Sequence, residues 1–238
     1  MLFSPQIPLP LEPSRENRFE DFVAGPNGPA IETLKSVLKD RDSLIFLSGP
    51  EGSGKTHLLN ALCLAAREKG MTAFHAGLRS MPEGSQALLE GLEKVGVVCV
   101  DDLHLVAGDE AWEEALFHCL NRIRSSQGRV VLSSNARLSA LPIVLPDLVS
   151  RLQWGLRLQL LGLDDADKIV VLEKHAATLG IELPADVGAY LIRHSSRNLS
   201  RLLYALGQLQ QAAFTSKRRI TVPLAREVLR QAQDHRLL

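Results

Sequence analysis

A run of glycines with one lysine and one threonine constrains this chain more than any other feature. Residues 49–56 read Gly-Pro-Glu-Gly-Ser-Gly-Lys-Thr, which fits the pattern G-x-x-x-x-G-K-[ST]. Glycines let backbone N–H groups converge on phosphate oxygens, and a following helix directs its positive end at the same anion. The run follows an expected strand at Ser43–Ser48 and opens an expected helix that stops at Gly70. The sequence therefore predicts a phosphate-binding P-loop.

The polar residues of this loop have distinct expected roles. Lys55 reaches the β- and γ-phosphates, and Thr56 offers its hydroxyl to Mg²⁺. The expected cofactor is therefore ADP or ATP with Mg²⁺. The residues expected to contact it in and beside the loop are Pro50, Glu51, Gly52, Ser53, Gly54, Lys55, Thr56 and His57.

Short apolar runs alternate with helical stretches through the first part of the chain. Such alternation is typical of βαβ units, and hence of a parallel sheet covered by helices on both faces. Besides Ser43–Ser48, the expected strands are Thr72–Ala76, Gly96–Val100 and Arg129–Ser133. The expected helices beside the one after the loop are Ile31–Leu38, Ser85–Leu92 and Glu110–Ser125.

The two ends of the chain differ from this central part. The prolines within residues 1–14 exclude a regular helix or a central strand, so a flexible tail is expected there. We expect an α/β domain over residues 15–161 and a helical subdomain over residues 162–238. Its helices are expected at Asp164–Leu179, Pro184–His194, Leu199–Ser216 and Val222–Gln233.

Composition excludes several classes of protein. Lys plus Arg and Asp plus Glu both number 27, so no basic excess points to nucleic acid. The odd number and wide spacing of Cys63, Cys99 and Cys119 argue against a disulfide framework or a zinc site, and burial is expected for all three. Neither a signal peptide nor a membrane-spanning run is found, which predicts a cytoplasmic protein with no membrane partner.

Two aspartates follow the buried run of residues 97–100. Ligands bind at the carboxyl ends of strands in such sheets, so Asp101 is expected to hold Mg²⁺, through water. Asp102 is expected either to polarise an attacking water or to make a local hydrogen bond. An apolar run followed by two aspartates is also common at ordinary strand ends, and it is the preceding P-loop that favours a site.

Two further residues are candidates for catalysis. Asn135 follows the strand at Arg129–Ser133, where an amide can orient water or touch a γ-phosphate, although asparagine is also common in turns. Arg151 could stabilise phosphoryl-transfer charge on a neighbouring molecule, although its spacing alone favours a surface salt bridge.

Several segments match one known family. They are 18–22 (Arg-Phe-Glu-Asp-Phe), 49–59, 100–103, 107–110 with Trp112, 145–155 and 220–223. Together they resemble the AAA+ module of the bacterial replication initiator DnaA, and more closely the Hda family of DnaA-related regulators. The resemblance runs from about Phe19 to the end of the 238-residue chain.

The resemblance implies a fold and several roles. It implies a P-loop AAA+ protein with a five-stranded parallel sheet between helices and a small, all-helical C-terminal lid. It makes Asn135 the sensor-1 residue and Arg151 an arginine finger. The adenine base is expected near Phe22, Val23 and Asn27, where several neighbours would also serve.

The N-terminal tail also resembles a feature of this family. Residues 6–11 read Gln-Ile-Pro-Leu-Pro-Leu, similar to the Hda segment that docks on the DNA polymerase sliding clamp, the beta subunit. A proline-stiffened peptide loses little entropy on binding. Gln6, Leu9 and Leu11 are therefore the expected clamp-binding residues.

The sequence departs from the family at the sensor-2 position. Initiators carry an arginine where this chain has Ser200, in the segment Asn198-Leu199-Ser200-Arg201-Leu202. Arg201, one residue on, lies about 100° around the helix, unless the helix start shifts. Arg201 is the expected nucleotide contact, and Arg197 is the other candidate.

The resemblance implies a regulator that binds ADP or ATP, reaches DNA indirectly through the clamp and stimulates ATP hydrolysis by DnaA. At most weak hydrolysis of its own is expected, and a homo-oligomer is left open because AAA+ modules can stack. The alternatives are a self-sufficient ATPase of the helicase-loader type and a DnaA-like DNA-binding adaptor. The expected absence of a helix-turn-helix after the lid argues against the adaptor.

Overall fold

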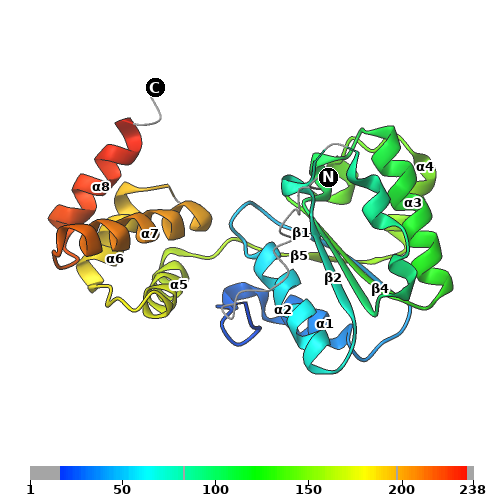
Figure 1. Ribbon diagram of the computed structural model, residues 1–238, viewed down its shortest axis with the longest axis horizontal. Coiled ribbons are helices and arrows are strands. Elements are labelled where there is room, and N and C mark those ends of the chain that lie inside the picture. Colours follow the sequence, from blue (N-terminus) through cyan, green and yellow to red (C-terminus); the bar gives the residue numbers. More distant parts are fainter. Residues whose placement is uncertain (1–16, 83, 197, 235–238) are drawn as a thin grey trace, which may run out of the picture.

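A five-stranded parallel sheet forms the centre of the larger domain (Figure 1). The computed structural model describes residues 17–82, 84–196 and 198–234. All strand pairs are parallel, and the order across the sheet is β2-β3-β4-β1-β5. The strands are β1 (Ser43–Ser48), β2 (Ala73–Gly77), β3 (Val97–Asp101), β4 (Arg129–Ser134) and β5 (Leu156–Gln159).

Helices cover both faces of this sheet, because successive side chains along a strand point to opposite faces. Ile45 and Leu47 of β1 pack in one cluster with α1 (Gly28–Ser36) and α2 (Lys55–Glu68). Phe46, between them, packs in the other cluster with α3 (Glu110–Ser125) and α4 (Pro146–Gln153). Every residue of β3 is buried, as expected for a central strand.

Four helices form the smaller, C-terminal lid. They are α5 (Asp165–Thr178), α6 (Ala185–His194), α7 (Leu199–Ser216) and α8 (Val222–Asp234). Leu172, Val187, Leu206 and Leu224, one from each helix, meet in a hydrophobic core of the lid's own. Figure 1 shows the lid on one side of the α/β domain, joined to it by the chain after β5. No helix in the described ranges is long and apolar enough to cross a membrane.

Hydrogen bonds hold the segment that leads from β5 to the lid. The side-chain amide of Asn27 donates to the Leu161 carbonyl at 3.1 Å and accepts from the Leu161 N–H at 2.8 Å. Asn27 is only 2% exposed, so both bonds are shielded from water. A weaker contact joins Lys174 Nζ of α5 to the Glu20 carbonyl at 3.5 Å.

The fold class expected from the sequence is confirmed. β1, α3 and α7 have the expected bounds, and the other matching elements shift by a few residues. The three cysteines are free and buried, as predicted.

Two expectations about local structure are wrong or incomplete. The helix expected at Ser85–Leu92 is two short 3-10 turns, Ser85–Leu89 and Leu92–Lys94. Gly84 and Gly91 adopt left-handed backbone angles, φ 80° and 76°, which interrupt a continuous helix. The strand β5 was not identified by an apolar run, because it is a short edge strand whose residues are mostly exposed.

Candidate nucleotide-binding site

The P-loop connects β1 to α2 at the edge where all five strands end, which we call the carboxyl edge. Gly52 and Gly54 have φ angles of 78° and 89°, a region that side chains disfavour. A Cβ atom on Gly54 would lie 2.4 Å from Cε2 of Phe22. The glycines are therefore required both for the backbone turn and for the close approach of Phe22.

The ammonium of Lys55 is turned into the loop. Its Nζ donates to the carbonyls of Gly49 at 2.8 Å and Pro50 at 2.9 Å, and the residue is 6% exposed. Burial lowers the pKa of Lys55, and the nearby Asp101 opposes that shift. Both partners are neutral carbonyls, so the charge of the ammonium is directed at the loop, and no carboxylate of the described residues forms a direct ion pair with it.

The first residue after this lysine reaches the end of β3. Thr56 Oγ1 donates to Asp101 Oδ2 at 2.5 Å, so the two expected Mg²⁺ ligands are in contact. The other oxygen of Asp101, Oδ1, accepts from Ser133 Oγ and, at 3.2 Å, from the Asp102 N–H. Ser133 also accepts from the Asp102 N–H at 3.1 Å. Ser133 thus orients the aspartates.

The β3–β4 register explains why sequence analysis did not identify Ser133 as part of the site. Val100 pairs with Leu132, so the next residues on the two strands, Asp101 and Ser133, lie side by side. A serine that closes an apolar strand carries no motif. Only the register brings it to the carboxylate.

Asp102 has a left-handed backbone, with φ 63°, directly after β3. Its Oδ2 forms an ion pair with Arg79 Nε at 3.2 Å, and its Oδ1 lies 3.9 Å from His104 Nδ1. His104 Nδ1 accepts from the backbone N–H of Asn135 at 3.4 Å. The candidates Asp102 and Asn135 are therefore connected through His104, a residue that the sequence did not identify as functional.

Burial lowers the pKa of His104, and the carboxylate of Asp102 is the first influence that opposes it. A neutral ring is consistent with its role as acceptor for Asn135, because Nδ1 must then carry no proton. The neutral His104 ring therefore lies between Asp102 and Asn135 and adds no positive charge there.

The residues expected near an adenine base lie on the N-terminal side of the P-loop. Phe22 packs on Gly54, and its ring centroid is 5.4 Å from that of His57. Val23 is half-buried beside it. Asn27, by contrast, has its side-chain amide hydrogen-bonded to the backbone of Leu161, in the segment that leads from β5 to the lid.

The lid approaches the P-loop with the N-terminus of α7. Asn198 Oδ1 accepts from the N–H of Ser200 at 2.9 Å and of Arg201 at 3.4 Å, which caps the helix. A Cβ atom on Gly52 would come within 3.0 Å of both Asn198 Oδ1 and the Leu199 N atom. The N-terminus of α7 therefore lies against the P-loop, although Ser200 and Arg201 are both exposed. The alternative candidate, Arg197, lies outside the described residues.

The loop fits a bound phosphate group. Ser53 Oγ is buried and has no hydrogen-bond partner among the described residues. This oxygen lies close to the backbone of Gly49, where a side chain would not fit. A Cβ atom on Gly49 would be 2.8 Å from Ser53 Oγ. A buried unpaired hydroxyl is costly, and a phosphate oxygen would satisfy it.

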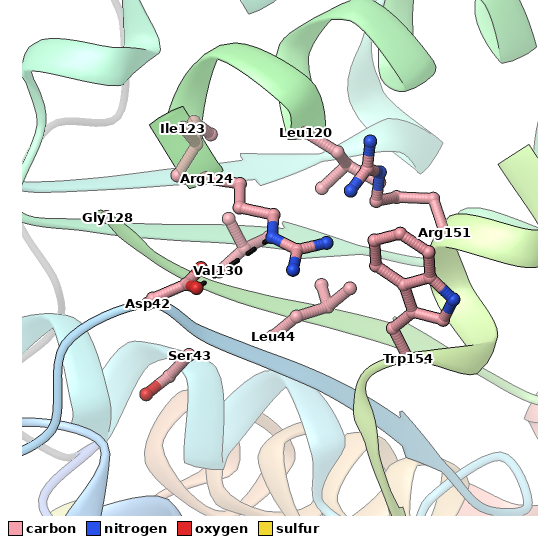
Figure 2. A pocket seen from close by; sticks show the side chains of 10 residues that line it. All are labelled: Asp42, Ser43, Leu44, Leu120, Ile123, Arg124, Gly128, Val130, Arg151 and Trp154. Atoms are coloured by element: carbon pink, nitrogen blue, oxygen red, sulfur yellow. Dashed lines mark ion pairs between the residues drawn. The ribbon is translucent and has the colours of Figure 1, made fainter. Parts of the chain in front are cut away.

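Arg151 lies at the opposite edge of the sheet, which we call the amino edge. It lines a pocket of about 120 Å³ whose other residues include the first residues of β1 and those at the start of β4 (Figure 2). Its Nη2 donates to Asn121 Oδ1 of α3, and its guanidinium carbon lies 4.6 Å from the ring centroid of Trp154. The structure therefore separates Arg151 from the other candidate residues, which meet at the carboxyl edge.

The sheet order, the P-loop and the helical lid define an AAA+ module. The family assignment agrees: residues 14–159 match the bacterial DnaA ATPase domain, and residues 165–229 match the lid domain of Hda. The chain belongs to the DnaA family of AAA+ proteins and has an Hda-type lid.

Solved structures agree with this assignment. Domain III of DnaA from Thermotoga maritima is 26% identical, with a TM-score of 0.80 over 92% of this chain and 97% of that one. AMPPCP-bound DnaA from Aquifex aeolicus is 24% identical, with a TM-score of 0.70 over 85% of this chain and 67% of that one. The branch-migration motor RuvB of Thermotoga maritima is 18% identical, with a TM-score of 0.68 over 92% and 73%, and shares the fold.

The clamp-binding residues Gln6, Leu9 and Leu11 lie outside the described residues. Their role stays a prediction from sequence, as do the domain boundaries at residues 14 and 161.

Proposed function

We propose that the protein is an Hda-type regulator that switches off replication initiation by promoting ATP hydrolysis on DnaA. The observation that carries the proposal is the separation of Arg151 from the P-loop of its own chain. The loop begins after Ser48, the last residue of β1, whereas Arg151 lies beside Ser43 and Leu44, the first residues. An arginine in that position is suited to act on a neighbouring molecule.

The chain's own P-loop is proposed to bind ADP or ATP with Mg²⁺. Lys55 would contact the β-phosphate, and the unpaired Ser53 hydroxyl would donate to the same group. Thr56 and Asp101 would hold Mg²⁺, which supplies charge neutralisation between the phosphates. Phe22 and Val23 would contact the base, beside His57, and Arg201 of the lid would reach the nucleotide.

In the proposed complex, Arg151 approaches the γ-phosphate of ATP bound to DnaA. Water attacks that phosphorus, the bond to the bridging oxygen breaks, and ADP and phosphate leave. Charge accumulates on the phosphate oxygens during this step, and a guanidinium that stabilises it accelerates hydrolysis by 10³ or more, to order of magnitude. Arg151 forms hydrogen bonds to these oxygens but no covalent bond, so it is unchanged at the end.

Residues 6–11 are proposed to bring the protein to the DNA-loaded sliding clamp. Binding to the clamp would concentrate the regulator at newly replicated DNA, so contact with DNA is indirect. The proposal is tested by the double substitution Gln6→Ala with Leu9→Ala. Clamp binding should be lost while nucleotide affinity is retained, and a double variant that still binds the clamp would refute the tail assignment.

A self-sufficient ATPase is the second candidate, since Thr56, Asp101 and Asp102 of the same chain lie together beside its own P-loop. The deciding experiment measures hydrolysis of DnaA-bound ATP with and without this protein, clamp and DNA. Stimulation that requires all three components supports the regulator. Rapid hydrolysis by this protein alone, with no effect on DnaA, supports the second candidate.

A further inference from the structure

The most exposed aromatic residue of the amino edge is Trp154, which directly follows α4. It is 65% exposed, whereas the chain's other tryptophan, Trp112, is 6% exposed and packs in the core. An indole left in water contributes little to folding, so its presence calls for another explanation. Its neighbours provide one.

Two guanidinium groups lie against the Trp154 ring. The Cζ atom of Arg151 is 4.6 Å from the ring centroid, and that of Arg124 is 4.4 Å from it. Figure 2 shows the three side chains together among the residues that line the pocket. Both distances are within the range of a cation–π interaction, for which tryptophan is the best partner.

The backbone fixes where the indole points. Trp154 is three residues after Arg151, a spacing that brings side chains to one side of a helix, and its N–H donates to the Arg151 carbonyl at 3.3 Å. The next residue, Gly155, packs against β1: a Cβ there would lie 2.8 Å from Leu44 Cγ and 2.9 Å from the Leu44 carbonyl oxygen. Leu152 is fully buried and fixes the end of α4.

The two arginines differ in what balances their charge. Arg124 Nε pairs with Asp42 Oδ2 at 3.8 Å, on the far side of the pocket from Trp154. Within the described residues, Arg151 has no carboxylate partner, and the contacts that hold it are the neutral amide of Asn121 and the neutral ring of Trp154. Such contacts orient a guanidinium without neutralising it.

We infer that Trp154 is a positioning residue that, together with Asn121, holds the Arg151 guanidinium in place with its charge free for a partner's phosphate. The inference rests on the proposed function of Arg151 and assigns the residue that orients it. The indole itself does not touch the reacting atoms. Its removal should therefore lower the rate at which bound DnaA hydrolyses ATP more than it weakens the complex.

The test uses the full chain with clamp, DNA and ATP-bound DnaA, and compares wild type with Trp154→Leu and Trp154→Phe. Trp154→Leu should lower the maximal stimulated rate about three- to fivefold, the value of an exposed cation–π contact, with little change in the half-saturating concentration. Trp154→Phe should restore most of the rate because it keeps an aromatic face. A change confined to the half-saturating concentration would instead make Trp154 a partner contact and overturn the inference.

A double-mutant cycle separates this inference from the function on which it rests. In the Arg151→Ala background, Trp154→Leu should cause no further loss of rate, because no guanidinium is left to orient. An equal loss in both backgrounds would overturn the positioning role. If wild type does not stimulate DnaA, or Arg151→Ala stimulates normally, it is the proposed function that fails. Equal melting temperatures of wild type and Trp154→Leu check that folding is intact.

Discussion

The candidate residues at the two edges of the sheet differ in how deeply they are buried and in what holds them. At the carboxyl edge, Ser53, Lys55 and Asp101 are buried, and they lie in or beside one contiguous loop. At the amino edge, Arg151 is only partly buried and is oriented by side chains from α3 and from the turn after α4. The P-loop is suited to bind a nucleotide within its own chain, whereas the proposed role of Arg151 is on a neighbouring molecule.

The largest expected effect tests whether the amino edge acts in trans. Arg151→Ala should reduce stimulated hydrolysis of DnaA-bound ATP about 10³-fold, because the guanidinium no longer stabilises the transferred phosphate. Single-turnover hydrolysis with labelled ATP on DnaA measures it. Arg230→Ala, which removes an exposed arginine from α8 of the lid, is the matched control and should behave as wild type. If Arg151→Ala stimulates DnaA normally, the amino edge has no role in hydrolysis on the neighbouring molecule.

The next effect tests the carboxyl edge alone. Lys55→Ala should weaken binding of a fluorescent ADP analogue about 10- to 100-fold, the value of a hydrogen bond to a charged group. Arg151→Ala should bind the analogue with wild-type affinity, since it lies at the other edge. If the two variants lose affinity equally, the edges are not independent.

A smaller effect tests whether the glycines of the carboxyl edge are required by packing. Gly54→Ala should lower the free energy of unfolding by about 1–3 kcal/mol, because the new methyl meets Phe22 and φ is 89°. Gly70→Ala is the matched control: its φ is 76°, and nothing lies within 4 Å of the added Cβ. Chemical denaturation should therefore find Gly54→Ala the less stable. Equal losses would mean that backbone strain alone matters and that the contact with Phe22 does not.

The smallest expected effect is the loss of folding stability at acidic pH. Burial lowers the pKa of His75 from 6.5, and its Nε2 has no hydrogen-bond partner in the described part of the chain. Below pH 6.5 the unfolded chain binds a proton that the folded chain does not, so stability should fall as pH falls from 6.5 toward the folded pKa. Melting temperatures of His75→Phe across this range should decline less than those of wild type. Identical slopes would exclude His75 as a source of acid sensitivity.

Local sequence was sufficient for most of the fold. Apolar runs predicted β1 and β3 because buried parallel strands have continuous hydrophobic sequence, and α3 and α7 have the bounds expected from the sequence. No apolar run predicts β5, because it is a short edge strand whose residues are mostly exposed. The helix expected at Ser85–Leu92 is wrong because Gly91, inside that range, has a left-handed backbone that separates two short 3-10 turns.

The sequence by itself determined the P-loop, because all of its chemistry lies in eight consecutive residues whose spacing is set by phosphate geometry. It also identified Arg151, through resemblance, but not what holds it. Only the tertiary structure decided that Ser133 orients Asp101 and that His104 lies between Asp102 and Asn135. Only the tertiary structure brought Arg124 of α3 to the Trp154 ring, beside Arg151. Strand register and helix packing join residues that are distant in sequence, and no local pattern encodes those contacts.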